Sequence, residues 1–445
     1  MKILFISLGC DKNLVDSEVM LGLLKENNYE FTDNEEEAEV IVVNTCCFIQ
    51  DAKEESIQTI LEMAEYRKKG LCKALVVAGC MAQRYQKEIK EEIEEVDAII
   101  GTTAIDKIVC VIEDILGNNG EKKDYDQIGD IHALTHVKEK RVITTGGHYA
   151  YLKIAEGCDK GCTYCIIPSL RGKYRSVPME RLIEEGTKLA EGGVKELILV
   201  AQETTVYGKD IYGEKMLPAL LKELCKIKGI VWIRIFYCYP EEITKELIKV
   251  IKEEEKICHY LDIPIQHASD NVLKRMGRRT NRKQLEELLE NLRKEIPDLC
   301  IRTTFMTGFP GEREEDFREL LEFIDKVEFD RLGVFTYSQE EGTLAASMDG
   351  QLTEEIKEER KAKIMELQQE ISLEKGEEMI GKELYAFVEG KVVDENAYIA
   401  RTYKDAPNVD GYLFIHSEEE LITGDFVKVK ITGALEYDLI GEAIG

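Results

Sequence analysis

Three cysteines within eight residues, Cys158, Cys162 and Cys165, have the spacing C-x3-C-x2-C. An iron–sulfur cube normally takes four cysteine thiolates, so a run of three leaves one iron free to bind something else. The alternatives are a zinc knuckle that lacks its fourth ligand and three unrelated thiols. Neither Cys nor His follows at zinc spacing, because the next cysteine is Cys225 and the next histidine is His259. The run therefore indicates an iron–sulfur site with an open iron.

This run lies inside a series of alternating strand and helix patterns. Six strand-like segments recur, at residues 149–155, 196–201, 231–237, 260–265, 300–306 and 331–337, with helical patterns between them. The series predicts a partial (β/α)6 barrel over residues 144–375, short of the eight units of a closed TIM barrel. Active sites of such barrels collect at the C-terminal ends of the strands, and the three-cysteine run follows the first strand.

A second set of cysteines stands at expected strand ends near the N-terminus. Cys10, Cys46 and Cys80 each follow a short apolar run, and helical patterns separate the runs. This alternation predicts a parallel α/β domain over residues 1–117, in which neighbouring strands would bring the three positions to one edge. A lone cysteine is usually a small buried apolar residue, but three at one topological position indicate a second three-thiolate site. Spacing alone leaves open whether Cys46 or Cys47 would bind.

Other polar or glycine-bearing loops are expected at the same end of the barrel. They are Gly192-Gly193, residues 202–205, residues 266–269 and residues 307–312. Glycines there would let a ligand lie against the backbone. His267 could orient a substrate, but a structural histidine with satisfied hydrogen bonds is an equal alternative.

Two further segments complete the expected domain plan. Residues 118–143 are polar and turn-rich, which is typical of a linker. Residues 377–445 change to short strands separated by turns, which predicts a small antiparallel β-barrel. Such barrels often bind oligonucleotides, but this one has six Lys and Arg against fifteen Asp and Glu. That balance would repel phosphates and attract a basic protein.

The composition of the whole chain also favours a basic protein partner over nucleic acid. The formal net charge of −28 argues against broad attraction to nucleic acid and suits a basic protein partner. We expect no membrane association, because there is no apolar run of about 18 residues, and no export signal. Thirteen cysteines in such a chain indicate reduced thiols and metal ligands in the cytoplasm.

On these residues the chain resembles the radical S-adenosylmethionine methylthiotransferases over its full length. Within them it is most similar to the RimO-type enzymes, which modify the small-subunit ribosomal protein uS12. The resemblance is carried by residues 7–18 (SLGCDKNLVDSE), residues 156–172, Tyr207-Gly208 and residues 262–269 (DIPIQHAS). It implies an N-terminal methylthiotransferase domain, a radical SAM core and a C-terminal TRAM domain. Sibling enzymes that act on tRNA adenosine typically carry a different sequence after the equivalent of Gln266.

The resemblance also implies the cofactors and their ligands. One 4Fe–4S cluster would be held by Cys10, Cys46 and Cys80, because the family usually has Gly where this chain has Cys47. The other would be held by Cys158, Cys162 and Cys165. S-adenosylmethionine would bind the open iron of that second cluster. Four residues are contacts for it by position: Tyr164, Gly193, Gln202 and Gly308.

The implied reaction uses both open irons. A one-electron donor would reduce the second cluster, which cleaves S-adenosylmethionine to methionine and a 5′-deoxyadenosyl radical. The radical would take hydrogen from an aspartate β-carbon of uS12. Sulfur on the first cluster, methylated by another S-adenosylmethionine, would then join that carbon.

Two other functions are weighed against this one. Methylthiolation of a tRNA adenosine would predict a basic surface on the TRAM domain and salt-sensitive RNA binding. A non-enzymatic electron carrier would have both clusters fully ligated and would not cleave S-adenosylmethionine. The acidic C-terminal segment and the two three-cysteine sets favour the enzyme that modifies uS12.

Overall fold

The computed structural model describes residues 1–117, 124–133, 141–393 and 396–444. The N-terminal part is a parallel sheet in the order β2-β1-β3-β4-β5. Its strands are β1 (Lys2–Ser7), β2 (Glu30–Phe31), β3 (Val40–Thr45), β4 (Ala74–Ala78) and β5 (Ala98–Ile100). β3 and β4 are buried along their whole length, as expected of strands with helices on both faces. β2 and β5 are too short to give a recognisable strand pattern in the sequence.

Helices cover both faces of this sheet. α1 (Asp11–Glu26) and α5 (Ile108–Gly117) pack on one face, and α2 (Gln50–Lys69), α3 (Gly79–Arg84) and α4 (Gln86–Glu92) pack on the other. Each loop that leaves a strand's C-terminal end therefore leads directly into a helix. The first residues of those loops lie along one edge of the sheet.

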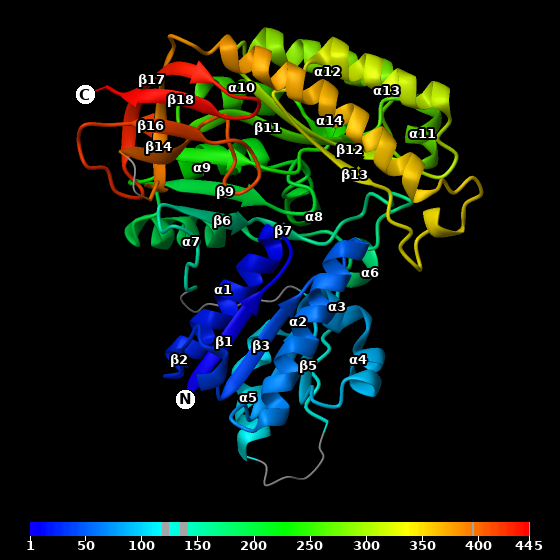
Figure 1. The fold of residues 1–445 in the computed structure, drawn as a ribbon, viewed down its shortest axis with the longest axis vertical. Helices are drawn as coiled ribbons and strands as arrows, with labels where there is room; N and C mark the ends of the chain where they lie inside the picture. Colours follow the sequence, from blue (N-terminus) through cyan, green and yellow to red (C-terminus); the bar gives the residue numbers. More distant parts are fainter. Residues whose placement is uncertain (118–123, 134–140, 394–395, 445) are drawn as a thin grey trace.

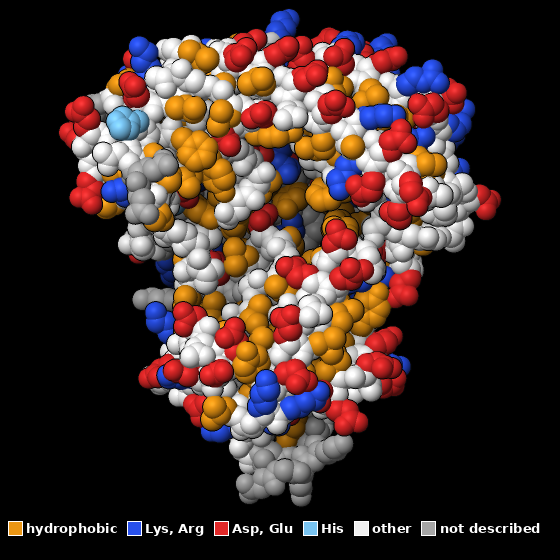
Figure 2. Space-filling view, viewed as in Figure 1, with side chains coloured by type: hydrophobic (Ala, Val, Ile, Leu, Met, Phe, Trp, Pro, Cys, Tyr) orange, Lys and Arg blue, Asp and Glu red, His pale blue; other side chains and the backbone are white. Residues whose placement is uncertain are grey.

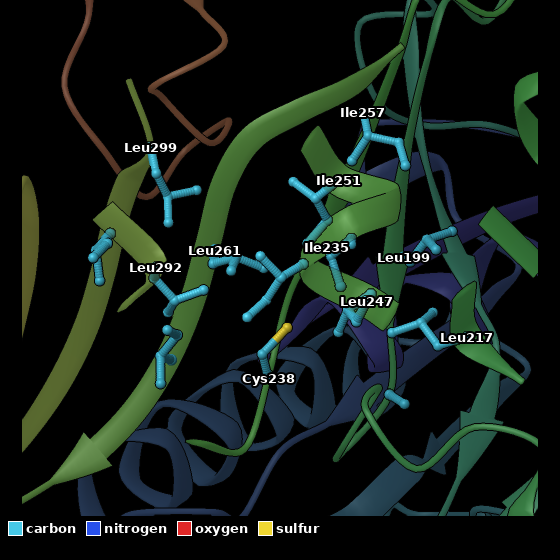
Figure 3. Packing of buried hydrophobic residues seen from close by; sticks show 14 of the residues in the cluster. Leu199, Leu217, Ile235, Cys238, Leu247, Ile251, Ile257, Leu261, Leu292 and Leu299 are labelled. Carbon is cyan, nitrogen blue, oxygen red and sulfur yellow. The ribbon is translucent and has the colours of Figure 1, made fainter. Parts of the chain in front are cut away.

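The central part is a half-open barrel of six parallel strands (Figure 1). The order is β13-β12-β11-β10-β9-β6, from β6 (Tyr149–Lys153), β9 (Glu196–Val200), β10 (Trp232–Ile235), β11 (Ile257–Gln266), β12 (Cys300–Thr307) and β13 (Arg331–Thr336). The main helices are α7 (Met179–Glu191), α9 (Leu217–Cys225), α10 (Lys245–Glu253), α12 (Arg282–Glu295), α13 (Glu314–Val327) and α14 (Glu354–Glu377). The six expected units are confirmed. Leu and Ile side chains from strands and helices interlock in its core, as Figure 3 shows.

Several short elements lie in the loops of the half-barrel. They are β7 (Ala155–Glu156), α6 (Ile167–Arg171), β8 (Arg175–Ser176), α8 (Lys209–Tyr212) and α11 (Asp270–Arg275). β7 and β8 pair antiparallel across the cysteine run that separates them. This pairing closes the loop that carries the run.

The C-terminal part is a closed five-stranded barrel, drawn in orange and red in Figure 1. Its strands are β14 (Glu383–Lys391), β15 (Ala397–Thr402), β16 (Leu413–His416), β17 (Phe426–Ala434) and β18 (Leu439–Ala443). The expectation of a purely antiparallel barrel needs one correction, because β16 and β18 pair in parallel. Closing five strands leaves these two with the same direction.

A buried ion cluster joins this barrel to the half-barrel. Glu196, the first residue of β9, accepts from Arg234 at 2.8 Å and from Arg401 of the barrel at 2.6 Å. All three side chains are fully buried. The barrel therefore packs at the end where the strands of the half-barrel begin.

The expected linker lies partly outside the described residues, which omit 118–123 and 134–140. Residues 124–133 of the linker contact the N-terminal sheet. Gln127 forms a parallel β-bridge with Ile100, and the Asp126 carboxylate accepts a hydrogen bond from the amide of Ile99 at 2.9 Å. None of the described helices combines the length and the apolar character that a membrane span requires.

Candidate functional site

The loop of the cysteine run is tied down on several sides. The Cys158 amide donates to the Gly172 carbonyl at 3.1 Å, and the Thr163 amide donates to the Met276 carbonyl at 3.0 Å. A side chain at Gly157, where φ is +78°, would place its Cβ 2.1 Å from a backbone oxygen. Glycine is therefore required there, and the close approach fixes the position of Cys158.

Charged groups hold the same loop from the barrel side. Lys160, in the middle of the run, binds Glu203 at 3.2 Å and Glu242 at 2.6 Å. Burial raises the pKa of Glu203 to about 7, and Lys160 acts against that shift. The run is thus fixed between two strand ends rather than exposed as a free loop.

The donor set of the run fits a metal centre. Burial raises the pKa of Cys158 to about 11 and that of Cys165 to about 12. Thiols in such surroundings become thiolates when a metal replaces their protons. Among the described residues, no three Cys, His, Asp or Glu side chains close around a single ion. Thiolates are the usual ligands of iron–sulfur clusters, so three buried thiols in one short loop suit such a cluster.

Buried polar atoms beside the run have no partner within the described part of the chain. They are Gln202 Oε1, Glu241 Oε2 and Arg278 Nε. Arg278 also lies 4.0 Å from Cys162 Sγ. Buried polar atoms are normally hydrogen-bonded, so these three fit a polar ligand with groups of both charges.

The four residues expected to contact S-adenosylmethionine do not all lie near the cysteine run. Tyr164 lies in the run with its ring edge-on to Phe309, and Gln202 follows β9 and donates to Glu156 at 2.7 Å. Gly308 follows β12 as expected, but its amide donates to Glu312 at 2.7 Å, and a Cβ would lie 2.2 Å from Lys357. Packing against α14 therefore explains why glycine stands there.

The expectation for Gly193 is wrong. Gly193 lies in the turn between α7 and β9, and the following Lys195 amide donates to His148 just before β6. The residue precedes its strand, so it lies at the opposite end of the half-barrel from the cysteine run. A contact with a ligand at that run is excluded by this placement.

The N-terminal set of cysteines also comes together. Cys10 follows β1, Cys46 follows β3 and Cys80 is in the first turn of α3 after β4. Burial raises the pKa of Cys46 to about 12, and the nearby Cys80 and Cys10 add to the rise. At Gly9, where φ is +88°, a Cβ would lie 2.5 Å from the Cys46 Cβ. Cys47 is buried in the apolar cluster between the sheet and α2.

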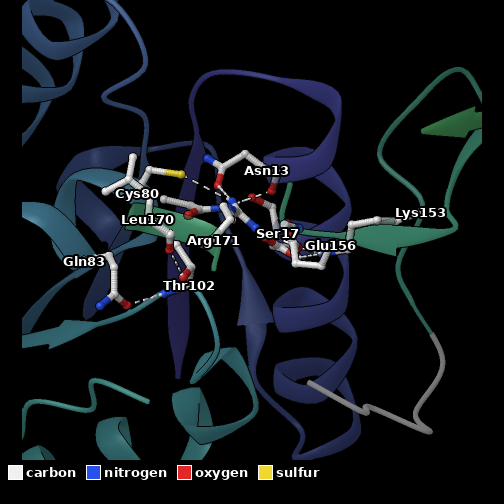
Figure 4. Close-up of polar contacts among 12 residues, drawn as sticks. Asn13, Ser17, Cys80, Gln83, Thr102, Lys153, Glu156, Leu170 and Arg171 are labelled. Atoms are coloured by element: carbon white, nitrogen blue, oxygen red, sulfur yellow. Dashed lines mark hydrogen bonds and ion pairs between the residues drawn. The ribbon is translucent and has the colours of Figure 1, made fainter. Parts of the chain in front are cut away.

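Arg171, for which the sequence predicted no role, connects Cys80 to Glu156, two residues before Cys158 (Figure 4). Its guanidinium donates to Cys80 Sγ at 3.4 Å, to Asp16 at 2.7 Å and to Glu156 at 3.0 Å. Glu156 also accepts from Gln202, so one hydrogen-bonded chain runs from the N-terminal thiols to the barrel. The position of Arg171 in the sequence, six residues after Cys165, was the signal that could have indicated a role near the cysteine run.

A second link is the segment that follows β10. The Tyr237 hydroxyl donates to Asp11, next to Cys10, at 3.1 Å, whereas the Tyr239 hydroxyl lies 3.8 Å from Cys162 Sγ. Tyr237 has a φ of +57°, a conformation that is strained for a bulky residue. One short segment therefore contacts the neighbourhood of both cysteine sets. Figure 2 shows a hollow in the half-barrel, above the N-terminal domain, with Lys and Arg atoms inside it.

One ring nitrogen of His267 is hydrogen-bonded, and the other, Nε2, has no hydrogen-bond partner among the described residues. His267 is fully buried, and its Nδ1 accepts from the Ser269 amide at 2.9 Å. Burial lowers its pKa to about 3, so the ring is neutral at ordinary pH.

Family models match three segments of the chain. An uncharacterized protein family, UPF0004, matches residues 2–101, the radical SAM superfamily matches residues 152–324 and the TRAM domain matches residues 380–444.

Curated relatives match over the full length. A ribosomal protein uS12 methylthiotransferase RimO from Lachnoclostridium phytofermentans is 63% identical, with 100% of both chains covered. One of the same name from Acetivibrio thermocellus is 52% identical, covering 100% of this chain and 98% of its own.

A solved structure shares the fold at low identity. The radical S-adenosylmethionine methyltransferase TsrM from Kitasatospora setae, with cobalamin and a 4Fe–4S cluster bound, is 14% identical with a TM-score of 0.53. The match covers 75% of this chain and 74% of that one.

Proposed function

The chain belongs to the RimO family of ribosomal protein uS12 methylthiotransferases, and from this we infer that it is a radical S-adenosylmethionine enzyme that methylthiolates uS12. The observation that carries the proposal is the pair of three-cysteine sets that one short segment relates, since Tyr237 contacts Asp11 beside Cys10 and Tyr239 lies 3.8 Å from Cys162 Sγ. The reaction needs a carbon radical made at one centre and sulfur delivered from another. Two centres joined through Tyr237, Tyr239 and Arg171 meet that need.

We propose two 4Fe–4S clusters as cofactors. Cys10, Cys46 and Cys80 would hold one cluster, and Cys158, Cys162 and Cys165 would hold the other. When bound, the second cluster with S-adenosylmethionine supplies a 5′-deoxyadenosyl radical, and the first supplies sulfur. The electron comes from a donor outside the chain.

The protein's own groups position the reactants. Gln202 is oriented by its bond to Glu156, which leaves Oε1 free to accept from an ammonium group of S-adenosylmethionine. Arg278 is held by the Pro264 carbonyl at 2.6 Å, which leaves Nε free to donate to an anionic ligand. The Tyr164 ring packs edge-on against Phe309 beside the cysteine run, where we propose that it contacts the bound S-adenosylmethionine.

We propose that the modified group is the β-carbon of an aspartate in uS12. A basic protein substrate suits the acidic chain, and the TRAM barrel is itself acidic, so strong direct binding to nucleic acid is not expected. Ribosomal proteins are made and assembled in the cytoplasm, and we place the enzyme there. We divide the chain into a methylthiotransferase domain (1–117), a linker (118–143), a radical SAM core (144–375) and a TRAM domain (377–445).

The proposal is tested after anaerobic reconstitution with iron and sulfide. The protein is incubated with S-adenosylmethionine, a reductant and either a uS12 peptide or a tRNA stem-loop, and mass spectrometry detects a methylthio group. Addition to the peptide is expected. Addition to the RNA alone would refute the assignment of the substrate.

Three cysteine variants separate the two centres. Cys158→Ala should abolish formation of 5′-deoxyadenosine. Cys10→Ala should keep that product and lose the methylthio group. Cys110→Ala, an exposed thiol outside both sets, should change neither. Methylthiolation by Cys10→Ala would show that the N-terminal set is misassigned.

A further inference from the structure

Most cations that flank the two cysteine sets are paired with carboxylates. Arg171 and Lys153 both bind Asp16 and Glu156. On the barrel side, Arg302 binds Asp262 at 2.8 Å and Asp410 at 3.3 Å. These charges are already neutralised and are poorly suited to bind a further anion.

Lys12 is different. It follows Cys10 by two residues in the first turn of α1 and is only 7% exposed. Within the described residues its ammonium group forms neither an ion pair nor a hydrogen bond. It lies 3.5 Å from the centre of the Tyr237 ring. Burying an ammonium group costs hydration free energy. Contact with an aromatic ring face compensates less of that cost than an ion pair with a carboxylate does.

Tyr237 is itself held in place. Its hydroxyl donates to Asp11, and its amide donates to Asp262 at 3.0 Å. The ring is therefore a fixed platform that holds the Lys12 ammonium beside the segment that runs from Tyr237, bonded to Asp11 next to Cys10, to Tyr239, 3.8 Å from Cys162 Sγ. The N-terminal end of α1 adds a partial positive charge at the same place.

We propose that Lys12 binds the side-chain carboxylate of the substrate aspartate; this rests on the proposed function. The reacting β-carbon has to meet the radical from one centre and the sulfur from the other, so it lies between them. The carboxylate is bonded directly to that carbon. Among the described residues, Lys12 is a cation beside the N-terminal cysteine set that has no anion, whereas Arg278, which also has none, lies beside Cys162 at the other set. The same contact selects an acidic side chain over a neutral nucleobase.

The test measures binding without turnover. Reconstituted enzyme with S-adenosylmethionine and no reductant is titrated with a fluorescent uS12 peptide that carries either Asp or Asn at the target position. The wild type should prefer the Asp peptide by about 10- to 100-fold, the usual value of a charge-assisted hydrogen bond. Lys12→Met should remove this preference by weakening the Asp peptide, whereas Lys12→Arg should keep most of it.

Controls separate this role from damage to the site. Lys25→Met makes the same charge change at an exposed position of the same helix and should bind like the wild type. Iron content and the Kd for S-adenosylmethionine should be unchanged in Lys12→Met. A persistent Asp preference in Lys12→Met would overturn the proposal, and so would a weaker Kd for S-adenosylmethionine with equal peptide binding. If the wild type prefers the Asp peptide but never methylthiolates it, the proposed function fails while the role of Lys12 stands.

Discussion

Gly9 offers a sharp test of the N-terminal cysteine set. A Cβ at this position would lie 2.5 Å from the Cys46 Cβ and 2.9 Å from its Sγ. Carbon atoms pack best at about 3.5–4.0 Å, so in Gly9→Ala the Cys46 side chain has to move by about 1 Å. Cys46 is proposed as a ligand, and the expected result is loss of the N-terminal cluster.

Gly70→Ala is the matched control. Gly70 also has a left-handed backbone, with a φ of +105°, but nothing lies within 4 Å of its ideal Cβ. Strain alone costs about 1–2 kcal/mol in either variant. Overpacking adds about 1–3 kcal/mol, and only in Gly9→Ala.

The assay is iron and sulfide per reconstituted chain, with thermal unfolding as the check on folding. Gly9→Ala should fall from about eight irons to about four, and Gly70→Ala should keep about eight. Gly9→Ala should still form 5′-deoxyadenosine, because the other cluster is untouched. A full iron content in Gly9→Ala would refute the assignment of Cys46.

Three other changes test the buried polar groups. Arg171→Gln should destabilise the chain by about 3 kcal/mol, because it leaves buried Asp16 and Glu156 with Lys153 as their one remaining cation among the described residues, and should lower the reduction potential of the N-terminal cluster by removing a donor to Cys80; calorimetry and redox titration measure the two effects. Glu196→Gln should lose a similar amount of stability and expose the C-terminal barrel to limited proteolysis, since buried Arg234 loses its anion and Arg401 keeps Glu389 alone; unchanged proteolysis would contradict that role. His267 has a folded pKa of about 3 against an ordinary 6.5, so the folded state binds fewer protons and loses stability as pH falls below 6.5. Between pH 7 and pH 5 the wild type should therefore lose about 2 kcal/mol more than His267→Gln in denaturant titrations, and equal losses would contradict a neutral buried ring.

Much of the architecture could be predicted because it depends on local patterns. Each long strand of the half-barrel is an apolar run bounded by turn residues, and each such run can be predicted from its own local sequence. β2 and β5 escaped because two or three residues do not make a pattern. The parallel pairing of β16 with β18 depends on how the barrel closes, which local sequence does not record.

The candidate site divides in the same way. The cysteine positions follow from strand ends, because topology alone brings strand ends together. Arg171 could not be assigned because its partners Asp16 and Cys80 are 155 and 91 residues away in the sequence. Gly193 was misplaced for a simpler reason, since a glycine before a strand lies at the opposite end from one after it.

The ion cluster at Glu196 has a consequence for the length of the substrate. It fixes the TRAM barrel at the start of β9, whereas the cysteine run lies beyond the strand ends. β9 has five residues, so the two places are separated by about 17 Å or more. A substrate that touches the barrel beside Glu196 and also presents its side chain beyond the strand ends needs a comparable reach. A short peptide can use the hollow alone, while an intact folded protein can use both surfaces at once.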